Sequence, residues 1–545
     1  MSVQAVPMSD AQSEAHASWA PMIAIALGQM IMSFNVASLP VAMGGMVKSF
    51  GVPPTTVATA IVAYGMLVAG FVMLGAKLCQ RYGATRVFRA AVVVFCGSQI
   101  LMTFSPTAAL MILAQGLCGA SASVIVPSLV ALIAGNYKGR QQATAVGALG
   151  SARAAAGVLA FVIGGVLGTY IGWRPVFGIL IATSAIVFLL SFRLKSDEAR
   201  PDVTIDMVGV VLAAAAIIFI SFGFNNLNRW GLALATPNAP FGLLGLSPAP
   251  ILILMGIVLG QGFLMWTHKR QQSGRTPLLA LDVLDSPEER AAVYAMFAVV
   301  ALEAALNFTV PLYIQIVQGR TPIATAVAML PFNLTVFFAA MLIVKLYDRL
   351  TPRQIGRYGF ILCTVALLWL AFVVHNDWSE VPVLFGLVLF GIGQGALVTL
   401  VFNVLVTSSP KELAGDVGSL RGTTQNLASA VGTATAGALM VGLLSAIALA
   451  GVAASPKLTP ELQAQVDLDN INFISNDQLQ NVLAGTSATP AQVAEAVRVN
   501  TDARLRALKI GLLFMAGLAF VTIIPASRLP SYRPGELPTD QPARR

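Results

Sequence analysis

The chain has 545 residues, of which 57% are hydrophobic and only 10% are charged, and its mean hydropathy is +0.78. A soluble protein of this length needs more polar side chains than these to cover its surface. The composition therefore indicates an integral membrane protein. The apolar stretches are long and uninterrupted, which favours membrane-spanning helices. A membrane β-barrel is excluded, because its strands would appear as short segments of alternating hydrophobicity.

The net charge of +9 is unevenly distributed. Most Lys and Arg residues lie in one alternating set of loops and in the C-terminal tail, which is the asymmetry expected for the cytoplasmic side of a membrane protein. The charge therefore predicts orientation, and we expect no nucleic acid partner. The four cysteines and three histidines show neither metal-ligand nor nucleophile spacing, so we expect no enzyme, no catalytic residue, no metal and no cofactor.

Apolar runs bounded by Gly, Pro and charged residues predict the membrane-spanning segments in chain order. An even number of spans places both termini on one side, which the basic loops identify as the cytoplasm of a bacterial inner membrane. The fourteen predicted spans are at about 19–46, 55–78, 87–104, 107–134, 141–170, 174–192, 206–224, 249–268, 291–317, 323–346, 355–374, 381–407, 412–448 and 508–526.

Two similar basic loops indicate an internal duplication. AKLCQRYGATR (76–86) follows the second span and VKLYDRLTPR (344–353) follows the tenth, while AVGALG (145–150) and DVGSLR (416–421) open the fifth and thirteenth. Such duplication is typical of secondary transporters, although chance similarity of basic loops and Gly-rich helices is the alternative. The predicted domains are a cytoplasmic tail (1–18), a six-helix half (19–192), two additional helices (193–290), a second six-helix half (291–526) with an external loop (449–507), and a cytoplasmic tail (527–545).

Several motifs in order along the chain resemble the major facilitator superfamily, specifically its fourteen-span drug:proton antiporter branch. They are the loop after the second span, QGLCGASASVIVPS in the fourth, the Gly-Gly-x-x-Gly and GWRPVF of the fifth and sixth, VTIDMVGVVL entering the seventh, and PLYIQIVQGRTPIATAVAMLPF across the ninth and tenth. The chain departs from this family by carrying Gln80 where an acid is usual, Gln115 where an Arg is usual, and no Asp ahead of Pro40.

The resemblance implies an all-α polytopic fold of two six-helix halves with two inserted central helices. It also implies a carrier that works by alternating access and exports small amphipathic or cationic organic compounds in exchange for protons. The alternatives are a carrier for an anionic metabolite or lipid-like product, and a non-transporting receptor or scaffold. Besides the lipid bilayer, substrate and protons, the external loop offers a docking place for a periplasmic adaptor protein.

Ionisable residues inside a membrane are costly, so they are the first functional candidates. Glu303 lies about 18 Å into the ninth span and Arg153 is similarly deep in the fifth, taking 1.5 Å per residue. The family architecture places the ninth span against the central cavity, which makes Glu303 the best candidate for a proton carrier or a counter-ion to a cationic substrate. A permanently protonated, purely structural Glu is the alternative. Arg153 needs an acceptor, either Glu303, a substrate carboxylate or backbone carbonyls.

Polar side chains elsewhere in the spans either orient a substrate or hold helices together. On the ninth span, Asn307, Pro311 and Gln315 follow Glu303 at successive spacings of four, on one helical stripe. The remaining substrate-binding or proton-coupling candidates are Gln29, Asn35, Gln115, Gln394 and Asn403. The predicted gating residues, which can pair across the halves or with helix ends, are Lys77, Gln80, Arg81, Lys345, Asp348, Arg349 and Arg421.

Overall fold

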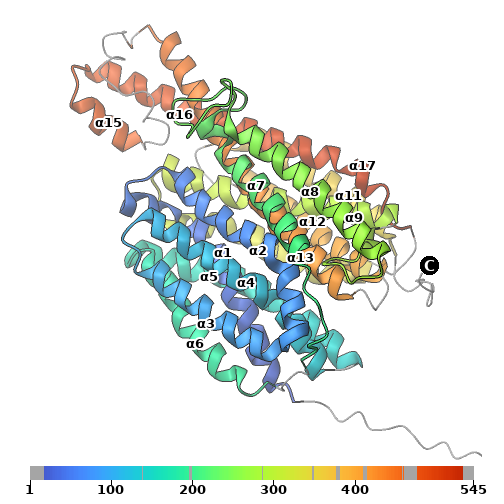
Figure 1. The fold of residues 1–545 in the computed structure, drawn as a ribbon. Coiled ribbons are helices and arrows are strands. Elements are labelled where there is room, and N and C mark those ends of the chain that lie inside the picture. The colour runs from blue at the N-terminus through green and yellow to red at the C-terminus, as the bar shows by residue number, and fades with distance from the viewer. Residues whose placement is uncertain are drawn as a thin grey trace, which may run out of the picture.

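The computed structural model of the protein describes residues 18–137, 139–194, 199–284, 286–346, 349–375, 381–408, 414–456, 458 and 476–531. Within these ranges fourteen helices are long and apolar enough to cross a membrane, which confirms the fourteen predicted spans. They pack side by side along one common direction (Figure 1). Because their number is even, the chain enters and leaves the bundle on the same side. We call this the terminal side, and the other the distal side.

The first six helices form one group. α1 packs against α5 and α6, α2 against α4, and α3 against α4 and α6. The helices of this first group are α1 (Ala20–Phe50), α2 (Pro54–Tyr82), α3 (Ala84–Thr103), α4 (Ala108–Asn136), α5 (Gly139–Tyr170) and α6 (Arg174–Ser191).

The helices after residue 286 form a second group, in which α9 packs against α12 and α13, and α11 against α12 and α16. A short 3-10 turn, η1 (Leu281–Leu284), precedes this group. The second group comprises α9 (Pro287–Leu312), the π turn η2 (Tyr313–Val317), α10 (Pro322–Leu342), the 3-10 turn η3 (Ile343–Leu346), α11 (Pro352–Val373), α12 (Val381–Ser408), α13 (Ala414–Ala454), α15 (Asn476–Ala484), α16 (Pro490–Val521) and α17 (Ile523–Ala526).

The two groups meet mainly through two helix pairs, α2 with α13 and α5 with α10. In the predicted duplication α2 corresponds to α10 and α5 corresponds to α13. The two contacting pairs are therefore equivalent to each other by this symmetry. The contacts are close: a Cβ atom added at Gly65 of α2 would lie 3.3 Å from the Cβ of Ala430 in α13, and Thr423 donates a hydrogen bond of 3.3 Å to the carbonyl of Ala69. Small residues thus let the two groups approach, as is usual between membrane helices.

The pair α7 (Met207–Trp230) and α8 (Pro248–Gln272) is inserted between the groups in the chain. α7 packs against both α2 and α13, so it covers one seam between the groups, while α8 packs on α7 and faces outward (Figure 1). Asp206 fixes the terminal end of this pair: its buried carboxylate caps α7, accepts the Trp266 indole N–H at 3.1 Å and lies 3.6 Å from Arg270. This carboxylate thereby joins the start of α7 to the end of α8.

The last long helix begins well before the predicted membrane span. The span predicted at 508–526 corresponds to the later part of α16, which begins at Pro490 and ends at Val521, together with the short α17. A capping box starts it there: the Thr489 hydroxyl accepts the Gln492 N–H, and the Gln492 side chain accepts the Thr489 N–H. The polar first turns of α16 project beyond the bundle with α15 (Figure 1), where Asn476 bonds Asn500, Thr501 and Arg504.

Candidate translocation site

Glu303 lies on α9 where that helix is held tightly inside the second group. Two residues before it, Ala301 packs against Gly432 of α13, where no side chain larger than hydrogen fits: a Cβ atom would lie 2.8 Å from the Ala301 Cα. One turn before Glu303, the Val299 carbonyl accepts a 3.2 Å hydrogen bond from Gln394 of α12. Glu303 is therefore carried on a closely packed part of α9, and its own side chain is half-buried.

Charged and phenolic side chains from both groups come together around this position. Arg153 of α5 lies close enough to Glu303 to interact electrostatically with its carboxyl group. Arg153 interacts in the same way with Arg421 of α13 and with the buried Tyr64 of α2. Among the described residues Glu303 forms no hydrogen bond or ion pair. The charges predicted separately on three helices thus lie in one neighbourhood between the groups.

The polar stripe on α9 divides between two environments. Asn307, one turn beyond Glu303, is half-buried, and its Oδ1 atom is buried without a hydrogen bond partner. Gln315 lies two turns further, in the π turn η2, and is 6% exposed. Its carboxamide bonds the backbone of α1. Asn307 therefore shares the neighbourhood of Glu303 by its position, while Gln315 joins the two helix groups.

Asn35 and Gln115, two of the predicted cavity amides, bond each other. Asn35 donates to Gln115 at 2.9 Å and accepts from it at 3.2 Å, and Gln99 of α3 donates to Asn35 at 3.2 Å. Gln99 also donates to the Cys118 sulfur at 3.1 Å. All three amides are fully buried, so they connect α1, α3 and α4 inside the first group. Gln99 is not among the polar residues predicted from the sequence. An isolated amide inside an apolar span is nevertheless a pattern that can identify such a residue.

The other predicted substrate-binding residues are more dispersed. Gln29 bonds Ser33 within α1 at 2.9 Å, both half-buried. Gln394 is fully buried between α12 and α9, with its Oε1 atom unbonded. The side chain of Asn403 lies outside the described residues. Tyr64, which is not among the residues predicted from the sequence, interacts electrostatically with Arg153.

The predicted gating loops are only partly described. Lys77 is buried on α2, and the Arg81 guanidinium lies 3.4 Å from the Val203 carbonyl while the Gln80 carbonyl accepts the Arg200 N–H at 3.0 Å. The first basic loop therefore contacts the segment that leads into α7. In the second loop, Arg349 is exposed, and the Lys345 side chain and Asp348 lie outside the described residues.

No set of three or more His, Cys, Asp or Glu side chains is arranged to hold a metal ion within the described part of the chain. The site brings a carboxyl group, guanidinium groups and a phenol into one neighbourhood inside the bundle. A carboxyl group and guanidinium groups contributed by helices of two groups change their mutual distances whenever the groups move.

Comparisons with known proteins agree with this architecture. The chain is 23% identical over 424 residues to the tetracenomycin C resistance and export protein of Streptomyces glaucescens, covering 77% of this chain and 76% of that one. It is 23% identical over 448 residues to the multidrug efflux pump LfrA of Mycolicibacterium smegmatis, covering 82% and 84%.

Solved structures show the same fold at low identity. A POT family peptide transporter aligns with a TM-score of 0.58 and 15% identity, covering 93% of this chain and 96% of its own. The sequence model of the Major Facilitator Superfamily matches residues 25–433, which is well over half of the chain. This match also confirms the expectation of a transport protein without enzymatic activity. The chain belongs to the major facilitator superfamily.

Proposed function

We propose that the protein exports small amphipathic or cationic organic compounds across a bacterial inner membrane in exchange for protons, with both termini in the cytoplasm. The observation that carries this proposal is the placement of Glu303 near Arg153, on helices of different groups and with no bond to a described residue. The export and multidrug efflux activities named for the similar bacterial proteins support the substrate class.

The coupling follows from competition for one carboxyl group. When Glu303 is ionised it can balance a bound organic cation or attract Arg153, and when it is protonated it can do neither. Proton binding and cation binding at Glu303 therefore exclude each other, which is the condition for exchange. Asn307 supplies an unbonded amide oxygen one turn away, where a substrate N–H group can bind.

The test is simultaneous measurement of ethidium movement and lumenal pH in proteoliposomes, with ethidium as an amphipathic organic cation. We expect wild-type protein to move protons opposite to ethidium and Glu303→Gln to lose the proton movement. Asp502→Asn makes the same chemical change at a half-exposed acid of α16 and serves as the control. Unchanged proton movement in Glu303→Gln would remove the assignment, and no ethidium movement by the wild type would remove the proposed function.

A second substrate class is favoured by one observation. Arg153 and Arg421 come close enough to interact electrostatically, and two neighbouring guanidinium groups attract an anion. Replacing ethidium by carboxyfluorescein in the same vesicles distinguishes the two classes. Transport of the anion that is lost in Arg153→Gln, with no transport of ethidium, would favour a carrier for acidic compounds. A periplasmic adaptor at the α15 and α16 extension remains part of the proposal and is tested by cross-linking in cells.

A further inference from the structure

Gln315 connects the two helix groups on the distal side, at a place where both contributing helices contain a proline. It lies in the π turn η2, four residues after Pro311 of α9, and it contacts α1 just beyond Pro40. A proline removes one helical hydrogen bond and favours a local change in winding, and π turns occur often at functional positions. The Gln315 side chain is buried, at 6% exposure.

The Gln315 carboxamide bonds the α1 backbone at both ends. Its Oε1 accepts the Gly44 N–H at 2.8 Å, and its Nε2 donates to the Pro40 carbonyl at 3.1 Å. Residues 40 and 44 are four apart, so these two backbone groups are the pair that bonds directly in a regular helix. A side chain from the second group thus bonds both members of one backbone pair in a helix of the first group. We name this set of contacts the Gln315 latch.

Gly44 provides the space that this arrangement needs. A Cβ atom there would lie 2.8 Å from the Gln315 Oε1 and 3.1 Å from its Cβ. The adjacent Gly45 faces a different neighbour, since a Cβ atom there would lie 3.1 Å from the Trp173 ring. A Gly→Ala substitution at residue 44 therefore places a methyl group against Gln315, whereas the same substitution at residue 45 places it against Trp173.

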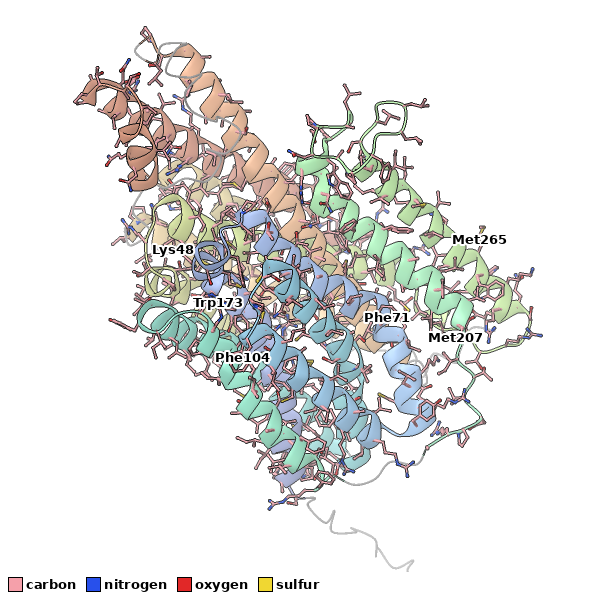
Figure 2. All side chains as sticks on the ribbon, turned by 60° about the vertical axis from the view of Figure 1, so that its left-hand side comes forward. Lys48, Phe71, Phe104, Trp173, Met207 and Met265 are labelled. Atoms are coloured by element: carbon pink, nitrogen blue, oxygen red, sulfur yellow. The ribbon has the colours of Figure 1, made fainter. Side chains whose placement is uncertain are left out.

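A second contact between the groups lies on the same side. The Ile323 N–H at the start of α10 donates to the Thr169 hydroxyl at the end of α5, at 3.1 Å, and Gly168 packs against Pro322. Both contacts lie towards the distal helix ends, so the two groups are bonded to each other on this side of the bundle. Figure 2 shows Lys48 and Trp173, which flank this region, at the end opposite Met207 and Met265.

We propose that the Gln315 latch holds the distal side closed, and that its release and re-formation accompany each transport cycle. This inference rests on the proposed alternating-access function. Its physical basis is that the bonds can be exchanged: on opening, water entering between the groups can satisfy the carboxamide, and the Pro40 carbonyl and Gly44 N–H can pair within α1. An apolar side chain at 315 could not provide this directional closing contact.

The experiment measures the distance between spin labels on the two groups at the distal side. Lys48→Cys and Thr321→Cys carry the labels, because both residues are exposed and Thr321 makes no side-chain cap bond to α10. A second pair, Arg86→Cys and Tyr358→Cys, reports on the terminal side. The background lacks the native cysteines, which are Cys79, Cys96, Cys118 and Cys363.

Gln315→Leu should shift the distal distances of substrate-free protein in nanodiscs towards longer values. Loss of two hydrogen bonds predicts a change in the ratio of open to closed populations on the order of tenfold. Gly44→Ala should act in the same direction and add nothing in the double variant, because both changes break one contact. Gly45→Ala and Thr325→Val, which removes a buried hydroxyl without a partner on α10, should leave the distances as in the wild type.

An unchanged distance distribution in Gln315→Leu would overturn the proposal, as would fully additive effects of Gln315→Leu and Gly44→Ala. The rate of ethidium transport provides a separate readout: Gln315→Leu should slow it, because the distal side closes less readily in each cycle, whereas Gly45→Ala should leave it as in the wild type. A wild type that moves no ethidium would contradict the proposed function, but the distance shift would still decide whether the latch exists.

Discussion

Replacing Asn35 by Leu tests whether the amides of the first group hold helices together or bind substrate. Asn35 participates in three hydrogen bonds of 2.9 to 3.2 Å with Gln115 and Gln99, all among fully buried groups. Interhelical hydrogen bonds in membrane proteins contribute about 0.6 kcal/mol each on average, which gives a loss of about 2 kcal/mol. The loss is larger where Gln115 is left without any partner, since a buried unsatisfied amide costs about 1 to 3 kcal/mol.

The assay is reversible unfolding in mixed micelles for wild type, Asn35→Leu, Gln115→Leu and the double variant. We expect each single variant to be destabilised, and the double variant to be destabilised by clearly less than the sum, because the two amides share bonds. Ethidium affinity of the folded fraction should remain unchanged. Weaker ethidium binding at unchanged unfolding free energy would refute the structural account and restore both amides as substrate ligands.

Two further changes test how the helices are positioned. Gly119→Val should destabilise the protein strongly or prevent its folding, because a Cβ atom at Gly119 would meet the backbone of Tyr64 where α2 and α4 pack together. The control Gly97→Ala should be tolerated, because a Cβ atom at Gly97 would have no atom within 4 Å. Size-exclusion profiles of the two variants compare them. Thr489→Ala should remove the capping box with Gln492 and cost about 0.5 to 2 kcal/mol at the start of α16. Faster hydrogen exchange confined to that turn, with normal ethidium transport, is the expected result, and exchange as slow as in the wild type would contradict it.

The fold could be predicted from sequence because its determinants are local. Each span is a long apolar run, and many begin at a proline with a polar residue before it, as at Ser286 and Thr351. The last predicted span begins at 508, later than the helix that contains it, because hydropathy identifies only the apolar part of that helix. The Thr489 and Pro490 start signal was present, and it initiates a polar helix that continues into the membrane.

The candidate site was predictable only as a set of residue types. Buried charge identified Glu303, Arg153 and Arg421, since each is costly in lipid wherever it points. The pairing of Asn35 with Gln115 was not visible, because the two are 80 residues apart and an amide is equally suited to a substrate or to another helix. The contacts of Gln315 combine a π turn with two prolines in different helix groups, which no local pattern specifies.

The most direct test of the central claim is the ethidium gradient at which net flow stops, measured in proteoliposomes at several imposed pH differences and zero membrane potential. An exchanger that uses Glu303 predicts that this gradient rises steadily with the pH difference in the wild type and is independent of it in Glu303→Gln. A stopping gradient that ignores pH in the wild type, or follows it equally in Glu303→Gln, would contradict the account.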